Sequence, residues 1–239
     1  MTKEDIVKER ISLMSRERQM AAIEVQGDII RYIDDPDEEM QMAAIKMNPD
    51  FIGHISNPTE NVQLEAVKQS SMAIRYIVNP SEKVQLEAVI KFPYSIDCIG
   101  KPTLRVQMAA VRNNPHVIQY IDDPSENLKW QAIKKDGSLI CSFKNPSEDM
   151  VRYVIKKGFG YAIRYIENPS EELQLEAIRS DFMSIRYIEN PTKKAKNLHK
   201  RLKNASEKKA YDQYLDYIIG ILDKVENDGM HIIEYDERE

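Results

Sequence analysis

Glycine, cysteine and histidine are scarce in this chain, and each shortage excludes a class of protein. The 239 residues include only 8 glycines, which argues against an all-β fold or a glycine-rich nucleotide loop. Cys98 and Cys141 are too few for a disulfide framework and lack the CxxC spacing of a zinc site. The four histidines are isolated and form no metal-binding motif. We therefore expect no metal site, no cofactor and no catalytic residues, and predict that the protein is not an enzyme.

Long apolar runs are also missing. No run approaches 18 residues, so no membrane span is predicted and no membrane partner is expected. The initial sequence MTKEDIVKERISL is charged and lacks the apolar segment of a signal peptide. The formal net charge of −5 is mild and gives no electrostatic reason to expect a nucleic-acid partner. Together with the low cysteine content, these features predict a cytoplasmic protein.

The chain contains instead an internal repeat. The heptapeptide IRYIENP occurs at 163–169 and again 22 residues later, at 185–191. Counted from a proline at position 0, the pattern is P-[ST]-E-x-apolar-Q-[LM]-x-A-[IV], about six variable residues, and I-x-Y-I-x-N. A first repeat without the proline begins near Met14, which gives eight repeats over residues 14–190. The prolines at position 0 stand at 36, 58, 80, 102, 124, 146, 169 and 191.

Each repeat is predicted to form two short helices. Proline excludes the preceding residue from a helix, and Ser, Thr or Asp at position 1 is a preferred N-cap. Pro49, Pro93 and Pro115 mark a second break and suit the first turn of a second helix. The apolar arc of the first helix, at positions 4, 5, 6, 8 and 9, is wider than one neighbour covers. The prediction is an all-α fold, an α-solenoid of about eight 22-residue two-helix repeats (14–190).

Glutamine occupies position 5, at the centre of that apolar arc. A buried amide without partners costs about 1–3 kcal/mol. We therefore expect each glutamine to bond the loop backbone of an adjacent repeat, although a ligand-binding role is the alternative. The six residues are Gln19, Gln41, Gln63, Gln85, Gln107 and Gln174.

The consensus NPSEExQLEAI…AIRYI resembles short helical repeats of uncharacterised bacterial and phage proteins. It is more loosely similar to the HEAT and armadillo superfamily, whose units are longer, near 40 residues, so only the architecture carries over. The resemblance covers about residues 14–190 and implies a binding surface for proteins, sometimes for nucleic acid. The phage-like character further implies a modulator of a host protein. No catalytic residue is implied.

A row of tyrosine and arginine residues near the end of the second helix is the first candidate site. Tyr and Arg supply binding hot spots, and they also stack on bases or hold phosphates. The alternative is that the tyrosines are half-buried and the arginines merely solvated. With the single tryptophan, the candidate partner-binding residues are Arg31, Tyr32, Arg75, Tyr76, Tyr120, Trp130, Arg164, Tyr165, Arg186 and Tyr187.

Repeats 6 and 7 depart from the consensus and are more basic than the others. Residues 124–168 hold 8 basic and 5 acidic side chains, although lysines at a helix C-terminus also have a structural reason to occur. A second basic run occupies 193–209. The candidate anion-binding residues are Lys134, Lys135, Arg152, Lys156, Lys157, Lys200 and Arg201.

Two segments flank the repeats. Residues 1–13 are predicted to form an N-terminal capping helix, and 191–239 a C-terminal helical segment with an acidic tail. The segment includes an amphipathic helix, YDQYLDYIIGILDKV, and then a short extended stretch, MHIIEYDERE. It serves as a cap for the last repeat or, alternatively, as a partner-binding arm, and a homodimer through it is a further option.

These features predict a non-enzymatic repeat scaffold that binds another macromolecule. The expected partner is a protein, bound through the tyrosine and arginine row. The alternative is a nucleic-acid-binding solenoid that uses the basic residues of repeats 6 and 7 and of 193–209. The acidic tail disfavours that alternative because it partly cancels the basic field.

Overall fold

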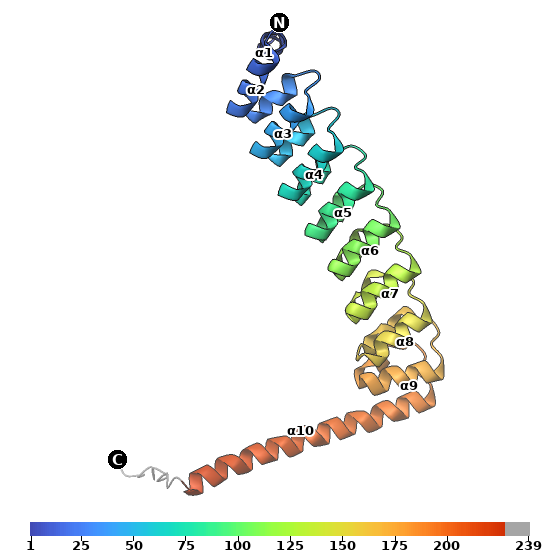
Figure 1. Ribbon diagram of the computed structural model, residues 1–239. Helices are drawn as coiled ribbons and strands as arrows, with labels where there is room; N and C mark the ends of the chain where they lie inside the picture. The colour runs from blue at the N-terminus through green and yellow to red at the C-terminus, as the bar shows by residue number, and fades with distance from the viewer. Residues whose placement is uncertain (228–239) are drawn as a thin grey trace. The chain divides into compact units, whose positions relative to one another are not determined.

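The computed structural model describes residues 1–227, with side chains to residue 224, and every element in that part of the chain is helical (Figure 1). The stretch 230–239, predicted to be extended, lies outside the described residues. The α-helices are α1 (Lys3–Ser12), α2 (Arg16–Val25), α3 (Glu38–Met47), α4 (Glu60–Gln69), α5 (Glu82–Lys91), α6 (Leu104–Asn113), α7 (Glu126–Lys135), α8 (Glu148–Lys156), α9 (Glu171–Ser180) and α10 (Lys193–Asn227).

Between these α-helices lie 3₁₀ helices of six residues each. They are η1 (Gly27–Tyr32), η2 (Pro49–His54), η3 (Ser71–Tyr76), η4 (Pro93–Cys98), η5 (Pro115–Tyr120), η6 (Gly137–Ser142), η7 (Gly160–Tyr165) and η8 (Phe182–Tyr187). One α-helix and one 3₁₀ helix thus make up each 22-residue repeat.

The chain forms two compact units, which are described separately. The N-terminal unit is Met1–Phe143 and holds α1 to α7 with η1 to η6; the C-terminal unit begins at Lys144 and holds α8 to α10 with η7 and η8. In the N-terminal unit, successive α-helices from α2 to α7 pack side by side, and so do successive 3₁₀ helices (Figure 1). Each α-helix also packs against the 3₁₀ helix of its own repeat. Repeats within a unit are therefore stabilised by their neighbours.

The predicted caps account for where the α-helices begin. In every repeat but the first, the side chain at position 1 accepts a hydrogen bond from the backbone N–H at position 4, as in Ser81 with Val84 at 3.4 Å and Asp37 with Met40 at 3.0 Å. At the other end of helices such as α5, an extended residue at position 12 breaks the helix, here Phe92 with φ −141°. Position 1 and position 12 thus set the length of the helix at ten residues.

The second helix of each repeat is a 3₁₀ helix rather than an α-helix. The residue at position 19 donates its N–H to the carbonyl at position 16, as Ile77 does to Ile74 at 3.1 Å. A segment of six residues bounded by extended backbone leaves little room for the wider i→i−4 ring, so the tighter i→i−3 pattern prevails. Pro49, Pro93 and Pro115 occupy its first turn as predicted.

The core lies between the α-helices and the 3₁₀ helices. Isoleucine at position 16 is at most 2% exposed in seven repeats, and half-buried as Ile185 in the eighth. Position 8 is fully buried in every repeat but the first, as in Ala88 and Ala110, so neighbouring α-helices approach closely there. Position 6 was predicted to lie in the apolar arc that neighbouring repeats cover, but it is partly exposed: Met42, for example, is only half-buried. That position therefore contributes to the surface as well as to the core.

The glutamines at position 5 bond loop backbone, but from Gln41 onward each donates to its own repeat, and only Gln41 and Gln174 also bond the next repeat as predicted. Gln41 donates from Nε2 to the Pro36 carbonyl of its own repeat at 2.8 Å, and its Oε1 accepts from the Thr59 N–H of the next repeat at 3.2 Å. Gln174 does the same with Pro169 and Thr192, at 3.0 and 2.9 Å. In Gln63 and Gln85 only the Nε2 bond is made, and Oε1 is buried without a partner.

This difference predicts unequal costs for removing the amide. Gln41→Leu deprives two loop groups of partners and is expected to lower the free energy of unfolding by about 2 kcal/mol, whereas Gln63→Leu removes one bond and should cost about half as much. The measurement is urea unfolding of both variants against the wild type. Equal costs, or a gain in stability for Gln41→Leu, would contradict the proposed role of Oε1.

The C-terminal helix begins as the α-helix of a further repeat, whereas the sequence predicted that the repeat ends at Pro191. Thr192 caps α10 through the Ala195 N–H at 3.2 Å, and Ala195 is fully buried. His199 Nδ1 lies 2.8 Å from the Phe182 carbonyl oxygen, and the two rings are 6.0 Å apart. Residues 192–199 therefore cover α9 and η8 as one more repeat would.

Candidate functional site

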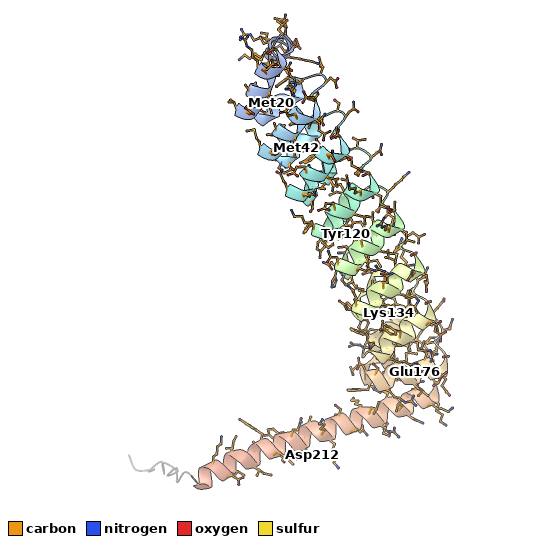
Figure 2. All side chains as sticks on the ribbon, viewed as in Figure 1. Met20, Met42, Tyr120, Lys134, Glu176 and Asp212 are labelled. Carbon is orange, nitrogen blue, oxygen red and sulfur yellow. The ribbon has the colours of Figure 1, made fainter. Side chains whose placement is uncertain are left out.

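The tyrosine and arginine row lies on the 3₁₀ helices, at positions 17 and 18. In the N-terminal unit, Tyr76 and Tyr120 are 44% and 42% exposed, whereas Tyr32 is half-buried. The guanidinium groups of Arg31 and Arg75 lie 5.7 and 5.8 Å from the ring centres of the tyrosines that follow them. Tyr120 is labelled in Figure 2. Consecutive 3₁₀ helices pack together, so these side chains line one surface of this unit.

The same positions in the C-terminal unit form a tighter cluster. The Arg164 guanidinium lies 4.1 Å from the ring centre of Tyr187 and 5.4 Å from that of Tyr161, and Arg186 also stacks on Tyr187 at 4.8 Å. Tyr165 and Tyr187 are half-buried, whereas both arginines are exposed. Both arginines therefore make cation–π contacts within the protein while they remain exposed to a partner.

Trp130 does not belong to this row. It lies at position 6 of α7, on the surface formed by the α-helices, where Lys134 Nζ is 5.7 Å from its ring. The predicted partner-binding residues are thus divided between the surface of the 3₁₀ helices and the surface of the α-helices.

Lys135 has a structural role that the sequence did not reveal. Its ammonium group donates to the Arg112 carbonyl oxygen, at the C-terminal end of the preceding helix. The same position makes the same bond elsewhere: Asn113 donates to Ile90 at 2.6 Å. Because helix ends leave carbonyls without intrahelical partners, position 11 caps the α-helix of the repeat before it. Lys135 is therefore better explained as a cap than as an anion-binding group.

Arg152 is likewise engaged within the protein. Its guanidinium contacts Glu148 at 3.0 Å, Glu176 at 2.9 Å and Glu172 at 4.0 Å. The hydrogen bond that Arg152 donates to Glu148, together with the charges of Glu176 and Glu172, raises the pKa of Arg152. The three carboxylates neutralise this arginine, so the structure argues against the predicted anion-binding role.

The remaining basic candidates are exposed and are divided between the two units. Lys134 belongs to the N-terminal unit, where it stacks on Trp130. In the C-terminal unit, Lys157 lies 5.7 Å from the Tyr153 ring, and Lys156 lines a groove between α8 and α9. Lys200 and Arg201 lie on α10, beyond its packed first turns.

The most distinctive site is a groove between α5 and α6, which was not predicted from the sequence. Its volume is about 590 Å³. Apolar side chains form most of its lining, and the only charges are those of Arg105 and Arg112. Ile90 and Leu104 are 60% and 53% exposed there. The full lining is Leu86, Ile90, Leu104, Arg105, Met108, Ala109 and Arg112.

Two exceptions to the repeat line this groove, one near each end. Position 10 is charged in every repeat except the fourth, where it is Ile90, and position 2 is charged in every repeat except the fifth, where it is Leu104. Successive α-helices run in the same direction: position 11 of α6 bonds the carbonyl at position 10 of α5, and Arg105 at position 3 pairs with Glu82 at position 2. Ile90 therefore lies near the end of the groove where α5 ends, and Leu104 lies near the other end, where α6 begins. These departures from the consensus were the signal available in the sequence.

A second groove, between α2 and α3, shows the contrast. It has a volume of about 630 Å³ and is lined by Met20, Met42 and Met47, the first two of which are labelled in Figure 2. Its rim carries three glutamates and one lysine, and position 10 is Glu24. Both grooves therefore have an apolar floor supplied by position 6, whereas the basic rim is a feature of the α5–α6 groove.

The electrostatics of the α5–α6 groove depend on its two arginines. Arg105 pairs with Glu82 at 3.4 Å, and both side chains are well exposed, so solvent weakens this pair. The Arg112 guanidinium makes no ion pair within the described part of the chain. The groove is therefore apolar at its centre and electropositive at its edge.

Among the described residues, no group of three or more His, Cys, Asp or Glu side chains is arranged to hold a metal ion. Within the same residues, no helix is both long and apolar enough to cross a membrane. No protein family, curated protein or solved structure matches this chain. The resemblance to helical-repeat proteins therefore rests on the repeat sequence itself.

Proposed function

We propose that the repeats form an α-solenoid that acts as a non-enzymatic scaffold and binds another protein through the α5–α6 groove. The observation that carries this proposal is the exposure of Ile90 and Leu104 in one groove. Both are exposed aliphatic residues at positions that are charged in every other repeat, and both line the same groove. Exposed aliphatic side chains gathered in one groove are typical of protein interaction sites.

The chemistry of the groove indicates the kind of partner. Four large aliphatic side chains offer a site for one or two apolar anchors, and Arg105 and Arg112 favour acidic groups beside them. An amphipathic helix with aliphatic anchors and flanking Asp or Glu residues would satisfy both features. Tyr76 and Tyr120 on the 3₁₀ surface would extend the contact to a larger partner.

A nucleic-acid partner receives less support. Arg152 is neutralised by glutamates and Lys135 caps a helix, so two of the seven candidate phosphate-binding residues are already engaged. Phosphate backbones bind arrays of free cations. Glu24, Glu38 and Glu39 at the rim of the α2–α3 groove further disfavour a polyanion on the α-helix surface of the N-terminal unit.

The test restores the consensus within the groove. The double variant Ile90→Lys, Leu104→Glu gives both positions the residue types of the other repeats, so we expect stability to change little. Each substitution removes an anchor and should weaken binding at least about tenfold. The matched control is Val78→Lys, which changes an aliphatic residue that is 84% exposed outside the groove.

The measurement is quantitative affinity purification from the cells that make the protein, followed by titration of the purified partner. We expect one protein to be retained by the wild type and by Val78→Lys, and lost with the double variant. Equal retention by all three chains would contradict the groove. Tight, salt-dependent binding of generic DNA or RNA by all three chains would instead favour the nucleic-acid alternative.

A further inference from the structure

The distal part of α10 is a long helix without tertiary cover. No side chain from residue 200 to 224 is buried, and only Leu202 and Ile218 in that stretch are half-buried. At 1.5 Å per residue these 25 residues extend about 37 Å. Isolated helices are marginal in water, so a helix of this length needs either a partner or strong local stabilisation.

This uncovered stretch is apolar over about three turns. Tyr211 and Tyr217 are 61% and 67% exposed, and Ile219 and Leu222 are 54% and 55% exposed. Aromatic and aliphatic residues recur there at intervals of three and four residues, at Tyr211, Tyr214, Ile218 and Ile221 or Leu222. That spacing produces the apolar seam through which two helices pair.

The charges of the segment are separated along its length. Residues 193–209 carry eight basic side chains and one acidic one, whereas 211–239 carry nine acidic and two basic side chains. Asp212, labelled in Figure 2, is the first acidic residue after the change. Two parallel copies would place like charges together, and two antiparallel copies paired along 211–222 would place Asp223 of each beside the basic end of the other at Lys208 and Lys209.

The same distribution argues against a lipid surface. A helix that lies on an anionic membrane carries basic residues beside its apolar face. In α10 the apolar residues 211–222 are interrupted by Asp212 and Asp216 and contain no basic residue. The apolar part is therefore the acidic part, which an anionic membrane would repel.

We propose that α10 pairs with α10 of a second copy of this chain in an antiparallel arrangement, with residues 211–222 at the interface. Such a pair is self-complementary and closes with two-fold symmetry, so it produces a dimer rather than a filament. This interface does not depend on the α5–α6 groove, and the dimer would present two such grooves to a partner.

Sedimentation equilibrium of the full chain tests the dimer. The wild type is expected at twice the monomer mass of 27.7 kDa. Ile218→Asp with Leu222→Asp places charges in the seam of both copies and should weaken dimerisation about 100-fold or more. Gln213→Asp, on the same helix but away from the seam, should remain dimeric, and so should Ile90→Lys with Leu104→Glu. A monomeric wild type, or a seam variant that remains dimeric, would overturn the proposal.

Cysteine crosslinking tests the orientation in a chain whose natural cysteines are replaced by serine. Ile218→Cys, near the centre of the seam, should crosslink to its counterpart. Asn204→Cys, well outside the seam, should not, because antiparallel pairing separates the two copies of that residue. Efficient crosslinking of Asn204→Cys would show parallel pairing and contradict the charge argument. Binding of a monomeric wild type to anionic vesicles would overturn the dimer in favour of a lipid surface.

Discussion

Gly160→Ala is expected to destabilise the C-terminal unit by about 3 kcal/mol, the cost of overpacking a rigid core. A methyl group at this position would lie 2.8 Å from the Ala177 carbonyl oxygen and 2.3 Å from Ser184 Oγ. The serine hydroxyl can rotate away, but the carbonyl belongs to the backbone of α9. It already accepts a hydrogen bond from the Asp181 N–H at 2.9 Å, which ends that helix. Relief of the clash therefore requires η7 and α9 to separate.

Hydrogen exchange by mass spectrometry measures this effect where it occurs, in α9 and η7. We expect faster exchange there in Gly160→Ala and unchanged exchange in Gly100→Ala, because Gly100 has no atom within 4 Å of the added methyl group. Adding Ser184→Ala should recover only part of the loss, since the backbone clash remains. Full recovery in the double variant would show that the hydroxyl alone caused the destabilisation.

Removal of residues 191–239 is expected to unfold the C-terminal unit and cause aggregation. The shortened unit would consist of two repeats, fewer than the three that such arrays generally need. Gln174 Oε1 would lose the Thr192 N–H, Glu171 would lose Lys194 at 2.7 Å, and the surface that buries Ala195 would be exposed.

A chain that ends at Ser206 is the control, because it keeps the packed turns of α10. Thermal unfolding by circular dichroism and light scattering should distinguish the two truncations. The chain ending at Asn190 should unfold at a lower temperature and aggregate, and the chain ending at Ser206 should remain folded. A soluble, fully folded chain ending at Asn190 would show that α10 is an arm rather than a cap.

The sequence predicted the features that depend on local chemistry. The 22-residue repeat, the caps at position 1 and the prolines at 49, 93 and 115 follow from backbone preferences that act within a few residues. The sequence did not indicate whether the second helix of each repeat would be an α-helix or a 3₁₀ helix, because both types begin and end with the same residue types. In six residues the outcome depends on how many hydrogen bonds fit between two extended segments.

The candidate site was predictable only in part, because its residues meet across repeats. Ile90 and Leu104 occupy different positions of different repeats, and only the packing of α5 on α6 places them in one groove. Lys135 was predicted to bind an anion because of its charge, but its ammonium group bonds a backbone carbonyl of the preceding repeat. That contact, too, forms between repeats. Trp130 is unusual in composition, yet it lies on a different surface from the tyrosines with which it was grouped.

The hydrogen bonds between repeats also determine how the length of this array can change. Gln41 bonds the backbone N–H at position 1 of the next repeat, and Glu60 accepts from the hydroxyl of Ser81, again at position 1 of the following repeat, at 2.6 Å. Deletion of residues 59–80 would place Ser81 where Thr59 now lies, and its N–H would meet Gln41. Gain or loss of one whole copy thus preserves both neighbouring junctions. A different length is accommodated where the extra residue falls between the two helices, as in the 23-residue repeat 146–168. Duplication within the gene can therefore lengthen such a protein without redesign of its interior.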